Sequence, residues 1–175
     1  PTWGETTDGS GNTTLYVTGI DGGGGGSSAF DTWATSNGVP TGSEAVDSDS
    51  GGLNNLGEFG LGGDPTDGND DGSLLHAFSD NLVGGAEEEG ILTILVRNGA
   101  SFTSAGDPAV SDAAVDGITY SVAADTTPDV DGGGLTVTPT AAVTTGLPAA
   151  PAGYKYVSFY VSGAEGYFQV TVAPE

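Results

Sequence analysis

The sequence predicts a mainly β protein: an antiparallel β-sandwich that follows two short helices and a separate N-terminal strand. The first observation is alternation of polar and apolar residues from about residue 73 to the end of the chain. The second is that Gly, Pro and Asp separate the alternating runs, with no helical pattern between them, which is typical of antiparallel sheets. The expected strands are 74–78, 91–97, 118–124, 135–139, 154–162 and 167–173.

Two short helices are expected ahead of these strands. Ser27 or Ser28 would cap the first, in which apolar residues recur at helical spacing from Phe30 to Ala34. The second repeats that spacing from Leu53 to Leu61, and the Gly-Gly pair beginning at Gly62 would end it. Glycines inside the second helix weaken it, because each costs about 1 kcal/mol relative to Ala. We therefore expect it to need support from its surroundings.

The run from Thr13 to Ile20 reads as one further strand, joined to the rest by a Gly-rich linker. A lone strand is not stable, so it must pair with an edge of the chain's own sheet or with a neighbouring subunit. The second alternative would make a homo-polymer. The expected domains are a strand and linker at 1–28, a helical module at 29–72 and a β-sandwich at 73–175.

Composition narrows the classes of function. The chain has 24 acidic residues against Arg97 and Lys155, a formal net charge of -22. This excludes nucleic-acid binding through phosphates and disfavours a polybasic membrane contact. Cysteine is absent, so neither a disulfide framework nor thiol catalysis is expected, and no apolar run is long enough to span a membrane. Because the sequence begins at Pro1, we expect a processed product.

The stretch from Asp47 to Glu58, DSDSGGLNNLGE, has the spacing of a calcium loop. Such a loop supplies oxygens from positions 1, 3, 5, 7 and 9 and a bidentate Glu at 12, with Gly at position 6. Gly52 occupies position 6, whereas Gly51 at position 5 leaves one side-chain oxygen missing. The expected Ca²⁺ ligands are Asp47, Asp49, the Leu53 carbonyl, Asn55 and Glu58.

The helix, loop and strands together resemble a known module. FDTWATSNGVPTG and DSDSGGLNNLGEFGLGGDPT resemble F-x-x-W-A-x-x-N-G-L-x-G followed by D-x-D-x-D-G-L-x-N-x-x-E-F-x-L-G-x-D-P. That pattern occurs near the C-terminus of secreted verrucomicrobial and planctomycete proteins, often those with a PEP-CTERM sorting tail. Its loop is similar to dockerin and thrombospondin type 3 calcium repeats. The resemblance covers about 29–175 and implies secretion and an EF-hand-like calcium module, without a settled biochemical activity.

A second acidic segment, GGDPTDGNDDGS, follows the loop. It would form a second calcium loop, lend an oxygen to the first ion, or be a solvated acidic turn. Asp64 and Asp67 are the less certain metal ligands that it adds. The Asp residues of the later loops read as turn formers, with calcium bridging to a neighbouring subunit as the alternative.

Other side chains are expected to be structural. His76 is the only histidine, so neither a zinc site nor a catalytic triad can be assembled around it, and no catalytic residue is expected. Tyr154, Tyr156 and Tyr160 share one strand face, which would pack on the helices, bind carbohydrate or meet another subunit. The link 163–166 suits a hairpin. Glycan attachment is possible at Asn12, in an N-x-T sequon, or on Ser and Thr residues.

These observations predict a secreted, non-enzymatic, calcium-binding structural protein. It would be a subunit of an extracellular filament or surface assembly, joined by donation of Thr13 to Ile20 to a neighbour's sheet (donor-strand complementation) and by calcium. The alternative is a carbohydrate-binding or anchoring module of a larger secreted enzyme. That alternative predicts a monomer with exposed aromatic side chains along a groove.

Overall fold

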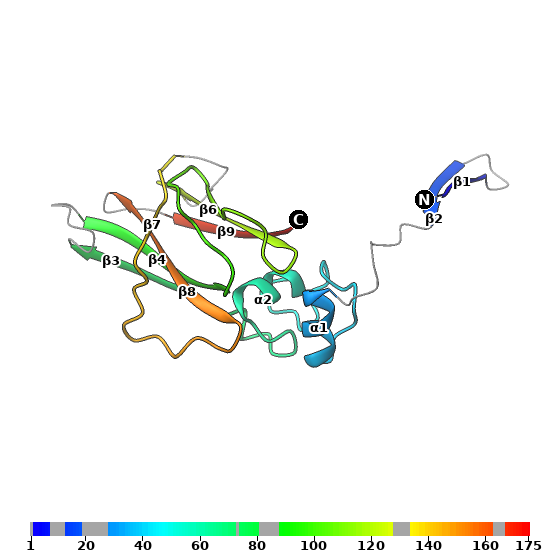
Figure 1. Ribbon diagram of the computed structural model, residues 1–175, viewed down its shortest axis with the longest axis horizontal. Coiled ribbons are helices and arrows are strands. Elements are labelled where there is room, and N and C mark those ends of the chain that lie inside the picture. Colours follow the sequence, from blue (N-terminus) through cyan, green and yellow to red (C-terminus); the bar gives the residue numbers. More distant parts are fainter. Residues whose placement is uncertain are drawn as a thin grey trace.

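The computed structural model describes residues 2–7, 13–18, 28–72, 74–80, 88–127, 134–162 and 167–175. Within these ranges the fold is mainly β, with antiparallel sheets and two short helices, as the sequence predicts (Figure 1). The helices lie at one end of the two larger sheets (Figure 1). None of the helices in the described part is long and apolar enough to cross a membrane.

The larger sheet has four antiparallel strands in the order β3-β4-β8-β7. They are β3 (Leu74–Asp80), β4 (Glu88–Arg97), β8 (Tyr154–Ser162) and β7 (Thr138–Thr140). In β4 the stripe Leu92, Ile94 and Val96 enters the core, as the alternation predicts. Ile91 and Leu95, on the opposite face, are buried as well. The centre of this sheet is therefore covered on both sides.

The smaller sheet has the order β5-β6-β9, with β5 (Ala109–Val110), β6 (Ile118–Asp125) and β9 (Tyr167–Pro174). Its inward residues join those of the larger sheet in one hydrophobic core. The prediction that 163–166 closes a hairpin is wrong in its pairing, because β8 pairs with β4 and β7 whereas β9 pairs with β6. The consecutive strands β8 and β9 thus belong to different sheets. The link between them lies outside the described residues.

Both predicted helices are confirmed. Ser28 caps α1 (Ala29–Ser36) in a capping box with Asp31, and Asn54 caps α2 (Asn55–Leu61), which ends at Gly62 in the left-handed conformation. The aromatic rings of Phe30, Trp33 and Phe59 lie 5.6–5.7 Å apart and join the two helices.

The N-terminal strand has a partner that the sequence did not reveal. Strand β2 (Thr13–Thr18) pairs antiparallel with β1 (Thr2–Thr7) in a separate two-stranded sheet, with Trp3 opposite Val17. The expectation that this strand joins an edge of the sandwich is therefore replaced by a local pair. The end of the predicted strand at Ile20 and most of the predicted linker lie outside the described residues.

Candidate functional site

The C-terminal half of α2 is fixed to both large sheets. The Tyr120 hydroxyl, from β6, donates to the Gly60 carbonyl at 2.9 Å, and the Tyr154 hydroxyl, from β8, donates to the Phe59 carbonyl at 2.8 Å. A Cβ at Gly60 would lie 2.7 Å from a methyl group of Val172, so this glycine permits close packing of α2 on β9. Tertiary contacts therefore stabilise this helix, which its interior glycines would otherwise weaken.

The N-terminal end of α2 is tied to the segment that precedes the predicted calcium loop. Asn55 is fully buried, and its Nδ2 donates to the carbonyl and the hydroxyl of Ser43 at 3.1 and 2.8 Å. The backbone N–H groups of Asn55 and Leu56 donate to the carbonyls of Val46 and Glu44. The segment that enters the loop is thereby held against the helix that carries Glu58.

The loop itself folds around its own carboxylates. Asp47 accepts hydrogen bonds from the N–H groups of Ser50 (2.7 Å) and Gly52 (3.1 Å), and Asp49 Oδ1 accepts one from Gly51 (2.9 Å). Gly52 has φ of 113°, so the sharp turn falls at the glycine where the spacing places it. Asp49 Oδ2 is buried and has no hydrogen-bond partner among the described residues.

Glu58 is the most unusual side chain in the described part of the molecule. It is completely shielded from solvent, and neither carboxyl oxygen has a hydrogen-bond partner there. Its pKa is raised from 4.5 to about 7, first by burial and then by the nearby carboxylates of Asp49, Asp71, Asp47 and Asp64, in that order of effect. We call these five residues the acidic cluster.

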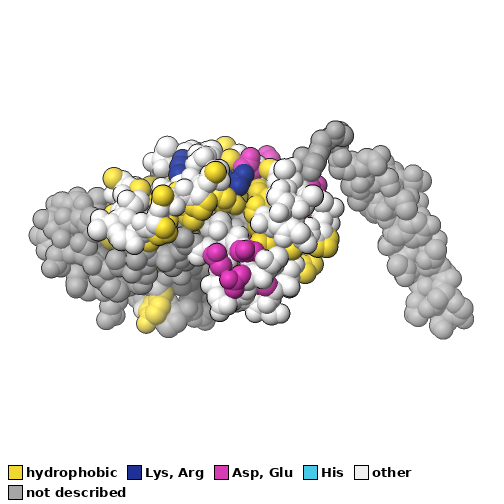
Figure 2. All heavy atoms as spheres, turned by 90° about the horizontal axis from the view of Figure 1, so that it is seen from below, with side chains coloured by type: hydrophobic (Ala, Val, Ile, Leu, Met, Phe, Trp, Pro, Cys, Tyr) yellow, Lys and Arg dark blue, Asp and Glu magenta, His cyan; other side chains and the backbone are white. Residues whose placement is uncertain are grey.

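In the described part of the molecule, neither Lys nor Arg neutralises the acidic cluster. Arg97 donates to Asp116 at 2.7 Å, with its guanidinium 4.7 Å from the ring centres of Phe59 and Tyr154. Lys155 lines a different hollow, beside Phe102. These are the only Lys and Arg residues in the sequence. Acidic side chains form a patch on the face shown in Figure 2.

The second acidic segment folds back on itself beside the loop. The Asp64 N–H donates to the Asp70 carbonyl at 2.9 Å, and Asp64 Oδ1 accepts from the N–H and hydroxyl of Thr66. Asp67 accepts two hydrogen bonds from Asn69, which lower its pKa. Of the two less certain ligands, Asp64 thus belongs to the acidic cluster, and Asp67 forms an exposed turn.

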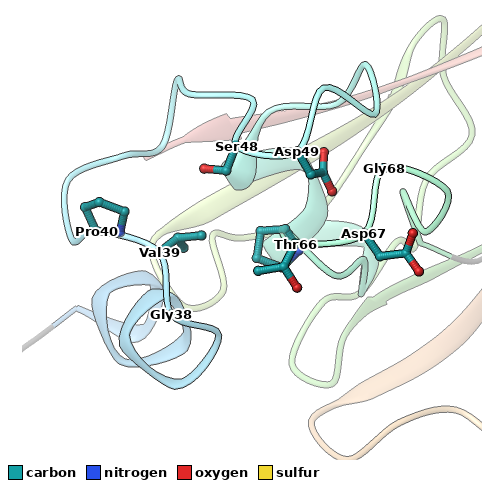
Figure 3. A pocket seen from close by; sticks show the side chains of 9 residues that line it. Gly38, Val39, Pro40, Ser48, Asp49, Thr66, Asp67 and Gly68 are labelled. Atoms are coloured by element: carbon teal, nitrogen blue, oxygen red, sulfur yellow. The ribbon is translucent and has the colours of Figure 1, made fainter.

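A hollow of about 500 Å³ opens between the two acidic segments and the chain that leaves α1 (Figure 3). Asp49 reaches it from the first segment and Asp67 from the second (Figure 3). Its lining residues are Gly38, Val39, Pro40, Ser48, Asp49, Pro65, Thr66, Asp67 and Gly68. None of these is aromatic, so this hollow is not the aromatic groove that a carbohydrate-binding module would use.

The fit of the predicted ligands to a cation is uneven. Asp47, Asp49 and Glu58 belong to one electrostatic cluster. Leu53 packs against the hydrophobic core, and Asn55 has a buried Oδ1 without a hydrogen-bond partner among the described residues. No group of three or more acidic or histidine side chains in the described ranges converges into a formed metal-ligand sphere. Within the described part, the two oxygens of Glu58 are the buried carboxylate oxygens without a hydrogen-bond partner that lie in this cluster together with Asp49 Oδ2.

Other residues singled out in the sequence have local roles. Tyr154 packs within the chain against α2, as one of the alternatives predicted. Asp112, Asp116 and Asp125 all accept hydrogen bonds from neighbouring residues. His76 lies in β3 opposite Leu92, and its side chain is outside the described part. Asn12 and two further loop aspartates, Asp129 and Asp131, also lie outside it.

Comparison with known proteins adds no assignment: no protein-family model, curated protein or solved structure matches this chain.

Proposed function

We propose that the acidic cluster binds Ca²⁺ and that the bound ion stabilises a secreted, non-enzymatic structural protein. The observation that carries the proposal is Glu58, a fully shielded carboxylate whose two oxygens have no protein partner in the described part and which lies among four Asp carboxylates. A buried ionised carboxylate without a partner is strongly unfavourable, and coordination to a metal is one of the few arrangements that compensate for it.

Calcium is the cation whose preferences best match these groups. Ca²⁺ takes six to eight oxygen ligands, including carboxylates and backbone carbonyls, in a flexible geometry. Asp47, Asp49 and Glu58 have the spacing that such a loop requires, and Asp64 and Asp71 add carboxylates from the next segment. Softer metals favour Cys and His ligands, and the cluster contains neither.

A structural role follows from where the cluster lies. Glu58 is carried by α2, whose next residues are hydrogen-bonded to Tyr120 and Tyr154 of the two sheets. A cation there would connect both acidic segments to the sheets through one short helix. Extracellular modules bind Ca²⁺ with dissociation constants of about 10⁻⁴ to 10⁻³ M, so the saline exterior of a cell would both fill the site and screen the charge of -22.

Assembly into a filament or surface layer is the further part of this proposal. Strands β1 and β2 form a two-stranded sheet, in which each strand has one edge that pairs with no other described strand. A two-stranded hairpin is marginally stable by itself. Addition to a sheet edge of a neighbouring subunit would complete its hydrogen bonding.

The calcium site is tested by thermal unfolding of the wild type, Glu58→Gln and a matched control, Glu44→Gln, in calcium and in chelator. Glu44 is half-buried, and its carbonyl accepts from the N–H of Leu56 at the edge of the same loop. Glu58→Gln should unfold at a higher temperature than the wild type in chelator at pH 7.5, because a buried charge is removed, and should lose the response to calcium. Glu44→Gln should keep that response. Equal responses in all three proteins would contradict the assignment.

Assembly is tested by deleting residues 1–26 and examining both proteins by size exclusion and electron microscopy, with and without chelator. We expect the full chain to assemble in calcium and the truncated chain to remain monomeric. Assembly that survives both the deletion and the chelator would refute strand donation and the calcium junction together.

A further inference from the structure

We infer that Asp71, from the segment after α2, supplies the oxygen that is missing at Gly51, so that two separate segments build one cation site. This inference rests on the proposed calcium site. It names a ligand that the loop spacing does not contain, and it predicts that the affinity depends on the segment 64–72.

The space that a side chain at position 51 would occupy is already filled. A Cβ placed on Gly51 would lie 2.8 Å from Asp71 Oδ1, 3.1 Å from Asp49 Oδ1 and 3.1 Å from the Cα of Gly68. A carboxylate oxygen of Asp71 therefore lies where the side chain of the fifth loop residue would begin. It is also close to the Asp49 carboxylate, which is one of the predicted ligands.

The two segments approach each other through glycines. A Cβ on Gly68 would lie 3.1 Å from the Asp49 carbonyl oxygen and 3.3 Å from the Gly51 nitrogen. The backbones are thus almost in contact at this point, and larger residues at either position would push them apart. Because position 51 is a glycine and not an acid, the two backbones can come this close, and Asp71 can approach the loop.

The same segment passes over Glu58. A Cβ on Gly63 would lie 2.7 Å from the Asp70 carbonyl oxygen, 3.0 Å from the carbonyl carbon of Asp71 and 3.1 Å from the Cβ of Glu58. The backbone at Asp71 and the side chain of Glu58 therefore both lie close to Gly63, on the side where its Cβ would be. Glu58 is fully shielded and both of its oxygens lack a hydrogen-bond partner in the described part, which is the second observation pointing to a bound cation.

Substitution at Asp71 provides the first arm of the test, measured by calorimetric titration of the full chain with CaCl₂. Asp71→Asn should weaken calcium binding about tenfold or more, because fewer anionic ligands lower the affinity of such loops. Asp67→Asn removes the same charge from the same segment and serves as the control, since Asp67 forms an exposed turn with Asn69. It should change the dissociation constant by about twofold or less through charge alone.

The second arm of the test moves the acid from position 71 to position 51. Gly51→Asp alone should weaken binding, because its Cβ would collide with Asp71. The double variant G51D/D71A removes the closest contact of that Cβ and returns an acid to position 51, so it should bind more tightly than Gly51→Asp, while the 3.1 Å approach to the Cα of Gly68 remains. This recovery would also show that any loss in Asp71→Asn is not a failure to fold, and circular dichroism of each variant checks the fold directly.

The outcomes separate the two proposals. A wild-type chain that binds no calcium overturns the proposed function. A second outcome would overturn only the role of Asp71. In that outcome the wild type binds calcium, Asp71→Asn and Asp67→Asn bind it equally well, and G51D/D71A binds it no better than Gly51→Asp.

Discussion

The charged groups of the sheets differ from those of the loop region, which we define as residues 38–72, in whether they have hydrogen-bond or ion-pair partners. In and between the sheets, Arg97 is paired with Asp116, and Asp112 accepts hydrogen bonds from Ser101 and Thr103. In the loop region, Glu58 and Asp49 have buried oxygens without a hydrogen-bond partner in the described part. Among the described residues of the sheets, one buried side-chain oxygen shares that property, the hydroxyl of Tyr156.

This difference indicates two sources of stability in one chain. The sheets share a continuous apolar core, which α2 also joins through Leu56, Phe59 and Leu61, and its burial is favourable whatever ions are present. The loop region brings acidic groups together without a basic partner from the chain, so we expect its stability to depend on a cation. The following predictions test that contrast.

The largest effect is expected from Phe159→Ala. Phe159 is fully buried in β8 and makes an edge contact with Phe102, with ring centres 4.9 Å apart. Removing a buried Phe side chain costs about 3–5 kcal/mol. The loss of unfolding free energy, measured by urea titration, should be the same in calcium and in chelator. A loss that depends on calcium would mean that the two regions do not differ in the way described.

The next largest effect is expected to be a dependence of the free energy of unfolding on pH, measured in chelator. The pKa of Glu58 is raised from 4.5 to about 7 by burial and by the nearby carboxylates. Because the native state keeps a proton that the unfolded chain loses, the stability present below pH 4.5 should decrease as the pH rises to about 7 and then level off. The full shift corresponds to roughly 3 kcal/mol.

Glu58→Gln supplies the control for this pH profile, because it removes the titrating group and should flatten the decrease between pH 4.5 and 7. Saturating calcium should also remove the decrease, since the ion favours the ionised carboxylate. A wild-type profile in chelator that is flat over this range, or that rises, would contradict the account of Glu58.

A smaller loss of unfolding free energy is expected for Tyr120→Phe, which removes the hydroxyl that connects β6 with α2. The hydroxyl accepts from the N–H of Arg97 at 3.0 Å and donates to the Gly60 carbonyl at 2.9 Å. Leaving these buried groups unpaired costs about 1–3 kcal/mol. Calcium affinity should also fall, because α2 is less firmly held. Unchanged stability in denaturant titration would show that the contact is not needed.

The smallest effect is expected for Asp112→Asn, in the sheet region. Hydrogen bonds from the Ser101 hydroxyl and from the hydroxyl and N–H of Thr103 lower the pKa of this carboxyl. Its contribution is present above the unfolded pKa of about 4 and is lost as the pH falls further. The variant should therefore be less stable than the wild type at pH 7, with the gap closing below pH 4 and no dependence on calcium. A gap that widens in acid would contradict this.

Elements with strong local patterns could be predicted from the sequence. Capping residues and helical spacing identified α1 and α2, and alternation identified β4, β6, β8 and β9. Strand β5 was missed because two residues carry no periodicity, and β1 because its sequence, TWGETT, has no apolar stripe. The pairing of β8 and β9 was misjudged because turn residues do not specify whether the next strand stays in the same sheet.

In the candidate site, too, local spacing could be predicted from the sequence, whereas contacts between separate segments could not. Loop spacing predicted Asp47, Asp49 and Glu58 as calcium ligands, and the structure places these three carboxylates in one acidic cluster. Asp71 was named in the sequence only as part of an acidic segment, and its approach to Gly51 depends on α2 turning the chain back over the loop. The one available signal was the absence of an acid at position 51, which shows that an oxygen is missing but not where another would come from.

Hydrogen–deuterium exchange followed by mass spectrometry tests the central claim most directly, because it compares the two regions within one molecule. Wild-type protein is measured in millimolar calcium and in chelator at equal ionic strength. The account predicts that calcium slows exchange strongly in peptides covering 47–72, while peptides from β4 and β6 change little. Equal exchange of residues 47–72 in the two solutions would contradict the claim that a cation stabilises the loop region.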